Sequence, residues 1–190
     1  MQATRYPVPG LSLRDLTRDD AAALCAHLLA LSDTDRSLRF AGALVTDASI
    51  ERYAAGIRFD HDAVIGLTGA KGLVDLAHGA LFSSAGAWLV EAAFSVDENW
   101  RGFGLGKWLM AAVQDFARQA GASEVAGMCL VRNLRMRRVF ECAGMTLTRE
   151  DGEVHAQGRL SCADALAAPA GLMRPGRVGK LSSQPVGLAL

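Results

Sequence analysis

The sequence predicts an α/β (α+β) domain built on a mixed sheet with helices on both faces. Three observations lead to this prediction. Short apolar or alternating runs, typical of strands, are separated by glycine turns, and longer runs with helical periodicity follow several of them. The chain has 190 residues, of which 51% are hydrophobic, and this is enough to bury the core of one domain.

The N-terminal part is expected to form one strand and three helical segments. Residues 11–16 alternate apolar and polar side chains, as a strand does. Thr17 and the acidic residues after it are typical of a helix start, and this helix is expected to run to about Leu31. His27 lies in its apolar stripe, so we interpret it as a core or interface histidine. Two further helical segments are expected at 32–40 and 47–55.

The rest of the sequence is expected to combine strands and helices. Glycine turns at 69–72 and at Asp151-Gly152 indicate two hairpins. Between them, one strand leads through a glycine-rich stretch into a long helix. The expected strands are 63–68, 73–82, 88–96, 125–130, 146–149 and 154–160, and the expected helices are 105–120 and one that begins at Asn133.

The most informative stretch is 99–109, with the sequence NWRGFGLGKWL. A strand-like run enters it and a helix-periodic run leaves it. Glycines let the backbone approach a phosphate closely, and the N–H groups of a first helical turn lack acceptors inside the helix. The stretch therefore predicts a phosphorylated ligand.

This stretch does not match two common phosphate loops. Trp108 follows Lys107 where a nucleoside triphosphatase needs Ser or Thr for magnesium. The glycines at 102, 104 and 106 also lack the spacing of a dinucleotide-binding loop. A different kind of phosphate loop is required.

With the spacing Arg101-x-x-Gly104-x-Gly106, the stretch resembles the pyrophosphate loop of the GCN5-related N-acetyltransferases (GNAT). The run 133–145, NLRMRRVFECAGM, resembles the second motif of this family, in which an Asn opens a helix that ends in an aromatic, a glycine and an apolar residue. The two motifs occur in a strand, helix, strand, helix order that covers about 89–144. On these motifs the sequence is identified as a member of the GNAT family.

The resemblance implies a GNAT fold, with a mixed, mostly antiparallel central sheet of about six to seven strands and helices on both faces. It implies acetyl-CoA dependent transfer of an acetyl group, by direct attack, to an amine of a protein lysine or a small molecule. Acetyl-CoA or coenzyme A is then the co-substrate, without a metal, and a homodimer stays open. The alternative function is a non-catalytic module that binds or senses acyl-CoA.

The resemblance also assigns residues to the site. Glu91 is the candidate catalytic base, strand residues around 95 face the pantetheine arm, and the loop cradles the pyrophosphate. The cofactor-binding residues it implies are Phe94, Ser95, Val96, Arg101, Gly102, Phe103, Gly104, Leu105, Gly106, Lys107, Asn133 and Phe140.

Two interpretations of Glu91 stay open. It is the only ionisable residue in its strand, and apolar neighbours should raise the pKa of its carboxyl toward the range useful for a base. The other interpretation is a structural carboxylate that pairs with an arginine or a backbone amide. His78 falls on the apolar phase of its own strand, which favours a buried imidazole over a second base.

One residue departs from the family pattern. Many members carry Tyr at the position of Phe140, where the hydroxyl protonates the departing thiolate, and phenylalanine cannot donate a proton. The same helix also carries a dense basic cluster that could meet the 3'-phosphate of coenzyme A, or an acidic acceptor surface, or could form a solvated face. The cluster consists of Arg132, Arg135, Arg137 and Arg138.

A second resemblance concerns the segment 31–40. Its pattern LS-x-x-S-x-x-RF is similar to an element in the acetyltransferase domains of bacterial protein-lysine acetyltransferases. Residues 1–165 are expected to form a single acetyltransferase domain. From about 166 to 190 the sequence loses periodicity and is rich in Ala, Pro, Gly and Ser, which predicts a weakly structured tail or a docking arm.

Composition excludes several other classes of function. Twenty basic and 20 acidic residues give no net charge, so no overall field attracts nucleic acid or an anionic membrane. The four cysteines form no C-x-x-C pair, and the histidines show no metal-ligand spacing. Without a membrane-length apolar run or a signal-like N-terminus, the protein is expected to be cytoplasmic.

Overall fold

A computed structural model of the chain describes residues 8–42, 45–70, 72–84 and 86–160. The expected tail, residues 166–190, lies outside these described residues. The strands are β1 (Ser12–Asp15), β2 (Ala63–Gly69), β3 (Gly72–Ser84), β4 (Ala87–Val96), β5 (Glu124–Leu130), β6 (Thr146–Glu150) and β7 (Glu153–Arg159). The α-helices are α1 (Ala21–Leu29), α2 (Asp33–Arg39), α3 (Asp47–Ala55), α4 (Leu105–Gln119) and α5 (Leu134–Cys142). Two short 3-10 helices, η1 (Arg18–Asp20) and η2 (Glu98–Trp100), precede α1 and follow β4.

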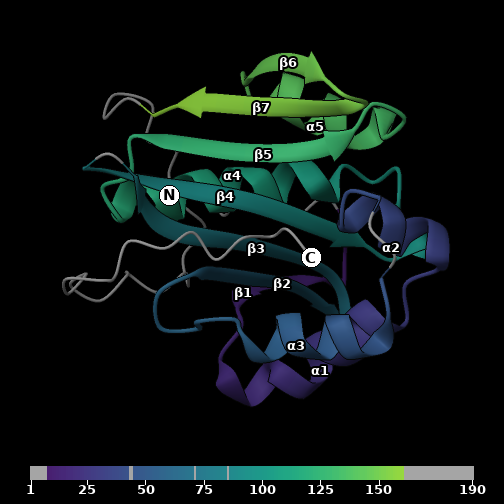
Figure 1. Cartoon of the computed structure of the whole chain (residues 1–190). Coiled ribbons are helices and arrows are strands. Elements are labelled where there is room, and N and C mark those ends of the chain that lie inside the picture. The colour runs from purple at the N-terminus through teal and green to yellow at the C-terminus, as the bar shows by residue number, and fades with distance from the viewer. Residues whose placement is uncertain (1–7, 43–44, 71, 85, 161–190) are drawn as a thin grey trace.

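The strands form one seven-stranded sheet in the order β1-β2-β3-β4-β5-β7-β6 (Figure 1). All neighbouring pairs are antiparallel except β4 and β5, which are parallel. Parallel neighbours need a crossover connection, and α4 supplies it. The expected mixed, mostly antiparallel sheet is confirmed.

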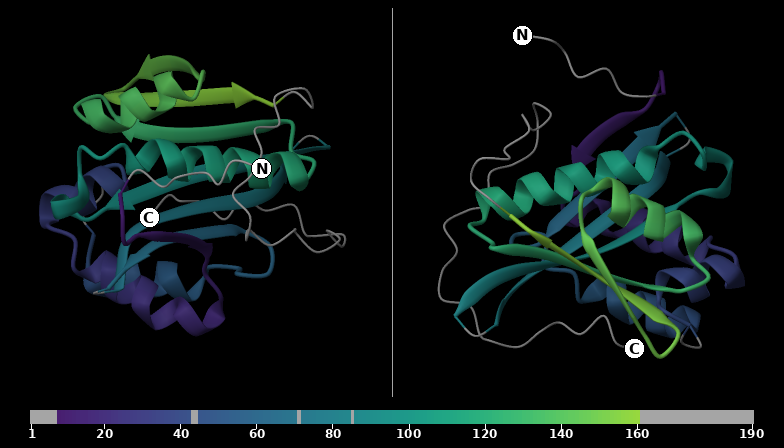
Figure 2. Two further views of the ribbon diagram at one scale, coloured as in Figure 1. Left: turned by 180° about the vertical axis from the view of Figure 1, so that it is seen from behind. Right: turned by 90° about the horizontal axis from the view of Figure 1, so that it is seen from above.

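Helices cover both faces of the sheet, as expected. Figure 2, seen from above, shows α4 and α5 on one side of the sheet and α1 and α3 on the other. Each layer of helices packs against the sheet around a separate hydrophobic core. The first core joins α4 to the sheet through residues such as Leu109 and Ile65, and the second joins α1 and α3 to it through residues such as Leu28 and Leu76.

Local sequence signals explain several element ends. Ser32 and Thr46 cap α2 and α3, each accepting a hydrogen bond from a backbone N–H of the first turn. Asp151 and Gly152 both have positive φ, at 47° and 86°, as the two central residues of a type I′ hairpin turn require. The expected hairpin between β6 and β7 is therefore confirmed at its turn.

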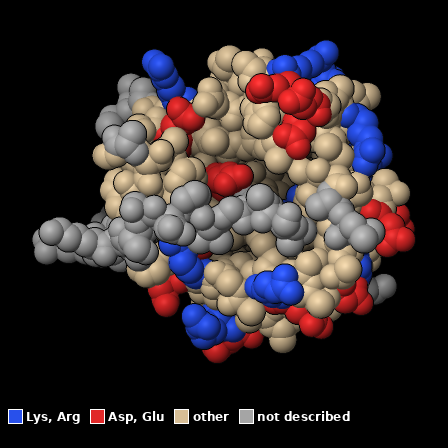
Figure 3. Space-filling view, viewed as in Figure 1, with Lys and Arg blue, Asp and Glu red and all other residues tan. Residues whose placement is uncertain are grey.

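Some strands of the sheet are buried on both faces and others on one face only. Along β2 and β3, residues are buried on both faces. Along β5 and β7, buried residues alternate with more exposed ones, and Met128 is 36% exposed. Figure 3 shows a hollow on the face away from α4, with an acidic side chain at its floor. Within the described residues, no helix is long and apolar enough to cross a membrane.

Candidate active site

A cleft opens where β4 and β5 separate. Their parallel pairing ends at Ala92 and Gly127, although the strands continue to Val96 and Leu130. Beyond Ala92, β4 keeps its hydrogen-bonded partner β3 on one edge only. The backbone groups of its other edge are therefore available to a ligand that lies alongside it as an added strand.

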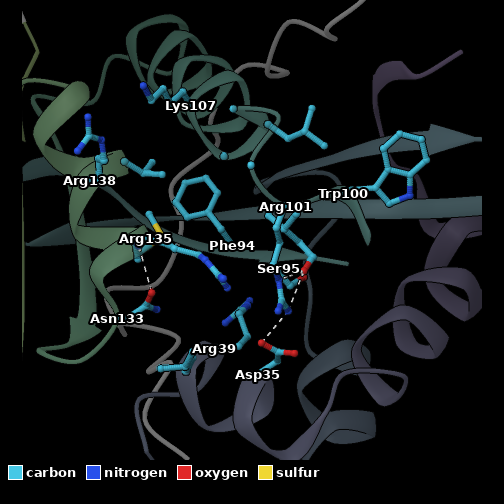
Figure 4. A pocket seen from close by; sticks show the side chains of 18 of the residues that line it. Asp35, Arg39, Phe94, Ser95, Trp100, Arg101, Lys107, Asn133, Arg135 and Arg138 are labelled. Atoms are coloured by element: carbon cyan, nitrogen blue, oxygen red, sulfur yellow. Dashed lines mark hydrogen bonds and ion pairs between the residues drawn. The ribbon is translucent and has the colours of Figure 1, made fainter. Parts of the chain in front are cut away.

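The cleft has a volume of about 400 Å³. Its walls come from α2, the end of β4, the loop before α4, the first turn of α4, and α5 (Figure 4). Ten of the expected cofactor-binding residues line it, namely Phe94, Ser95, Val96, Arg101, Gly102, Gly104, Leu105, Gly106, Lys107 and Asn133.

The first turn of α4 is built to receive an anion. Gly104 is the N-cap, with φ of 79°, and no side chain caps the turn or adds an acidic group to it. The N–H groups of a first helical turn point toward the helix end, where the helix dipole favours negative charge. Gly106 has a further structural reason to be glycine, because a Cβ there would lie 3.1 Å from Cγ2 of Val139 in α5. The sequence predicted the role of these glycines in binding an anion but not the close contact between Gly106 and Val139.

Arg101 forms an ion pair within the protein, whereas the sequence led us to expect it only as a cofactor-binding residue. Its Nη2 lies 2.7 Å from Oδ1 of Asp35 in α2, and its guanidinium also donates to the carbonyl of Val96. Burial alone would raise the pKa of Asp35, but hydrogen bonds from Arg101 and Ser32 outweigh it and lower that pKa. Arg101 thus ties α2 to the end of β4 and shares its charge with a carboxylate.

The remaining charges around the cleft are mostly positive. Besides Arg101, the lining includes Arg39 from α2, Lys107 from α4, and Arg135 and Arg138 from α5, whereas Asp35 is the only acid that lines the cleft in the part of the chain that the structure describes. Among the described residues, none of these four other cations forms an ion pair. A cleft lined by five cations and one carboxylate among the described residues suits a ligand with several negative charges.

Glu91 lies just before the point where the strands separate. In the sheet it stands opposite Ala80 of β3 and Ala126 of β5, and its side chain is half-buried. Burial raises the pKa of its carboxyl, and the positive charge of Arg39 acts in the opposite direction. Glu91 is not among the residues that line the cleft.

Two expected cofactor residues lie elsewhere. Phe140 is 1% exposed and belongs to the core beneath the sheet, where its ring occupies the space that a Cβ on Gly127 would need. It packs where β4 and β5 part and does not line the cleft. Phe103 is 52% exposed, beside the Trp100 ring at a centroid distance of 6.3 Å, and does not line the cleft either.

Asn133 and His27 support the cleft walls. The Asn133 side chain caps α5 by accepting a hydrogen bond from the N–H of Met136. His27 is buried, as expected, and its Nε2 lies 2.9 Å from Oγ of Ser95, which lines the cleft. Burial lowers the pKa of His27 and favours its neutral form. The histidine therefore fixes a residue of the cleft from behind.

Sequence reasoning missed the roles of Asp35 and Arg39. Both fall in the segment 31–40, but its pattern LS-x-x-S-x-x-RF does not reveal which residues they contact. Arg39 lines the cleft and bonds to Tyr53, which lies in another helix. The signal that could have found it is an arginine beside an aromatic residue in a segment that is otherwise a short polar helix.

Comparisons with solved structures support the fold. The GNAT domain of S. lividans PAT is 25% identical, with a TM-score of 0.66, over 78% of this chain and 89% of that chain. Spermidine N-acetyltransferase from Vibrio cholerae, in complex with CoA and spermine, is 14% identical with a TM-score of 0.62, over 80% and 96%. A phosphinothricin acetyltransferase from Sinorhizobium meliloti, in complex with AcCoA, is 15% identical with a TM-score of 0.62, over 85% and 95%.

A search of curated proteins finds no match. The family model described as the acetyltransferase (GNAT) family matches residues 21–145, which is more than half of the chain and contains β4, α4, β5 and α5. The separated strands, the glycine N-terminus of α4 and the matched family model agree, and the chain belongs to the GNAT family of acetyltransferases.

Proposed function

We propose that this protein transfers the acetyl group of acetyl-CoA to the amine of an acceptor, with Glu91 as the base. The observation that carries the proposal is the cleft. It combines the free backbone edge of β4, the uncapped N-terminus of α4 and four cations without a carboxylate partner among the described residues.

Coenzyme A fits these features in chemical class. Its pyrophosphate would accept hydrogen bonds from the N–H groups around Gly104 and Gly106, with Lys107 and Arg138 nearby. The amides of its pantetheine arm would pair with the backbone of β4 between Phe94 and Val96. The arm would then carry the thioester toward the end of the cleft near Glu91.

The proposed reaction is direct attack. Glu91 takes a proton from the acceptor's ammonium group, directly or through one water. The freed nitrogen attacks the thioester carbonyl carbon, a C–N bond forms and the C–S bond breaks. The nitrogen, which is positively charged after the attack, loses its second proton to solvent, and the amide results. A backbone N–H of β4 would polarise the carbonyl oxygen.

The leaving group takes its proton from solvent. Phe140 has no proton to donate and is buried away from the cleft. A thiol has a pKa of about 8.5, so the thiolate is a tolerable leaving group near neutral pH. The acceptor remains a protein lysine or a small amine in this proposal. The spermine bound to the similar acetyltransferase from Vibrio cholerae supports an amine in general.

Calorimetric titration with acetyl-CoA tests the cofactor site. The variant Gly104→Glu adds a negative charge at the proposed pyrophosphate cradle, and we expect it to weaken binding at least about 100-fold relative to a micromolar wild type. Gly121→Glu is a matched control. Gly121 follows the other end of α4, its φ of 73° resembles the 79° of Gly104, and a Cβ on either would meet no atom within 4 Å.

The two variants therefore share the same backbone strain and the same added charge. Equal loss of binding in both would contradict a specific cradle at Gly104, and no binding by the wild type would overturn the proposed function. Tight binding of acetyl-CoA without acetylation of any amine or protein would favour the non-catalytic sensor. Phe140 is the feature that favours that alternative, because no proton donor stands at its position.

A further inference from the structure

Arg39 is held from behind by a chain of polar side chains. Its Nη2 donates to the hydroxyl of Tyr53 at 2.6 Å, and that oxygen lies 2.6 Å from Nδ1 of His78. Nε2 of His78 lies 3.3 Å from Oδ2 of Asp62. The four residues come from α2, α3, β3 and the segment before β2, so the chain of contacts crosses the second core.

The direction of these hydrogen bonds follows from the donor groups. A guanidinium can only donate, so the Tyr53 oxygen accepts and its O–H is free to donate to Nδ1 of His78. Burial raises the pKa of the Tyr53 phenol, which keeps this proton in place although Arg39 acts the other way. A carboxylate oxygen can only accept, so Nε2 of His78 carries a proton and donates it to Oδ2 of Asp62.

The far end of the chain is fixed to the sheet. His78 is 2% exposed, and Asp62 also accepts hydrogen bonds from the N–H of Leu81 and from Arg58, at 3.1 and 2.7 Å. Buried polar groups are costly unless each finds a partner, and a satisfied network is rigid. The orientation of Arg39 is therefore determined by residues that do not touch the cleft.

The positive charge of Arg39 forms no ion pair with a carboxylate among the described residues. Its guanidinium carbon lies 4.9 Å from the Phe40 ring centroid and 5.2 Å from that of Tyr53, and its Nε is buried without a hydrogen bond among the described residues. No carboxylate of the described chain forms an ion pair with it, because Asp35, the acid on this side of the cleft, is bound to Arg101. The protein thus presents a fixed cation to the cleft.

The position of Arg39 separates it from the phosphate cradle. Figure 4 shows Arg39 on the side of the cavity opposite Lys107 and Arg138, with the side chain of Arg135 pointing toward it from α5. Guanidinium groups form strong, often bidentate, hydrogen bonds with carboxylates and phosphates, so an anion that enters here could be bound by both. Arg39 also acts on the carboxyl of Glu91, as the opposing effects on that residue's pKa indicate.

We propose that Arg39 binds a carboxylate of the acceptor, so that the acceptor is an amino acid or a similar molecule carrying both an amine and a carboxylate. This inference rests on the proposed function. The amine would face Glu91 while the carboxylate lies on the guanidinium of Arg39, with Arg135 as the second cation. The network of Tyr53, His78 and Asp62 positions Arg39 and touches no substrate.

Matched pairs of acceptors test this proposal. Release of coenzyme A is followed with acetyl-CoA and a series of α- and ω-amino acids, each beside its own carboxamide, which keeps the amine and removes the negative charge. We expect the best amino acid to exceed its carboxamide at least about tenfold in kcat/KM, mainly through KM. The affinity of CoA-saturated protein for the same pairs, measured by calorimetry, should show the same preference.

Two variants connect the preference to Arg39. In Arg39→Met, we expect the preference for the carboxylate to disappear, because kcat/KM falls more for each amino acid than for its carboxamide. Tyr53→Phe removes only the hydroxyl that holds the guanidinium. In this variant we expect a partial loss of the preference for the carboxylate. The affinity for acetyl-CoA and the melting temperature are measured alongside, because a purely structural role would lower activity with both members of a pair equally.

Three results would overturn the inference. The first is a wild type that acetylates or binds amines and carboxamides as well as amino acids, which leaves the proposed function intact. The second is an equal loss for both members of each pair in Arg39→Met. The third is a preference for succinyl-CoA over acetyl-CoA that Arg39→Met removes, because the carboxylate would then enter on the acyl group. Failure of the wild type to bind acetyl-CoA identifies failure of the proposed function itself.

Discussion

The two halves of the sheet differ in how many of their faces are covered. In β2 and β3, neighbouring residues enter different cores: Val64 and Leu76 belong to the core with α1 and α3, whereas Ile65 and Ala77 belong to the core with α4. In β5 and β7, only every second residue is buried. The site lies at the boundary between these halves, on β4.

This difference is visible in the sequence. A strand buried on both faces has a nearly continuous apolar run, whereas a strand with one open face alternates. The strand β2 begins AVIGL, whereas β7 has the sequence EVHAQGR. The covered half can position polar groups rigidly, as it does for His78, and the open half leaves the space through which the proposed acceptor would approach Glu91.

The largest expected effect compares one residue from each half. Leu76 is 0% exposed in β3, and Leu76→Ala should lower the free energy of unfolding by about 2–5 kcal/mol, because it leaves a cavity in a core that is closed on both sides. Met128 is 36% exposed in β5, and Met128→Ala should cost less than about 1 kcal/mol. Urea denaturation of both variants measures this; equal costs would contradict the difference in cover.

A smaller effect is expected from Asp75, a carboxyl in the covered half. Asp75 is 0% exposed, its Oδ1 accepts the N–H of Leu76, and its Oδ2 is without a hydrogen bond among the described residues. Burial raises its pKa well above the usual range, although the bond from Leu76 acts the other way. The folded protein therefore favours the protonated form.

The sign of the pH dependence follows from this raised pKa. The contribution of protonated Asp75 is fully present below the unfolded pKa of about 3.9 and is lost as pH rises toward the folded pKa, by about 1.4 kcal/mol for each pH unit. Asp75→Asn keeps the acceptor and removes the titration. We expect the variant to gain stability relative to wild type as pH rises through this interval in urea denaturation, and a constant difference would contradict the assignment.

Much of the fold was predictable because its signals are local. The helix at 47–55 was predicted at both ends, since its cap and its apolar spacing lie within a few residues. The hairpin turn at Asp151-Gly152 was predicted for the same reason, because both residues tolerate positive φ. Strand ends differed by one or two residues from the expectation, as they depend on the neighbouring strand.

The site was predictable only in part. The loop 101–107 and Asn133 could be proposed because glycine spacing and a helix cap leave a pattern in sequence, and all of these residues except Phe103 line the cleft. The partner of Arg101 was not predicted, since Asp35 lies in a distant helix and only folding brings the two together. The chain from Arg39 to Asp62 was missed for the same reason, because each of its members looks like an ordinary core or surface residue by itself.

Glu91 lies on β4, at the boundary between the two halves of the sheet. If it is the base, its carboxylate should control the pH dependence of the reaction. If Glu91 removes the proton from an ammonium group, kcat/KM for the acceptor should fall as pH decreases through the raised pKa of Glu91, which lies above the usual value of about 4.3. Between that pKa and the pKa of the amine, the profile should be flat. Without a base, only the neutral amine reacts, and the rate rises tenfold per pH unit up to the amine's own pKa.

The most direct test is the pH profile of kcat/KM for wild type and Glu91→Gln, with Glu124→Gln as a control at another half-buried glutamate of the sheet. We expect Glu91→Gln to lose at least about 100-fold near neutral pH and to follow the rising profile of the neutral amine, with unchanged affinity for acetyl-CoA. The control should keep the flat profile. A Glu91→Gln variant that retains the wild-type rate and the flat profile would contradict the assignment of the base.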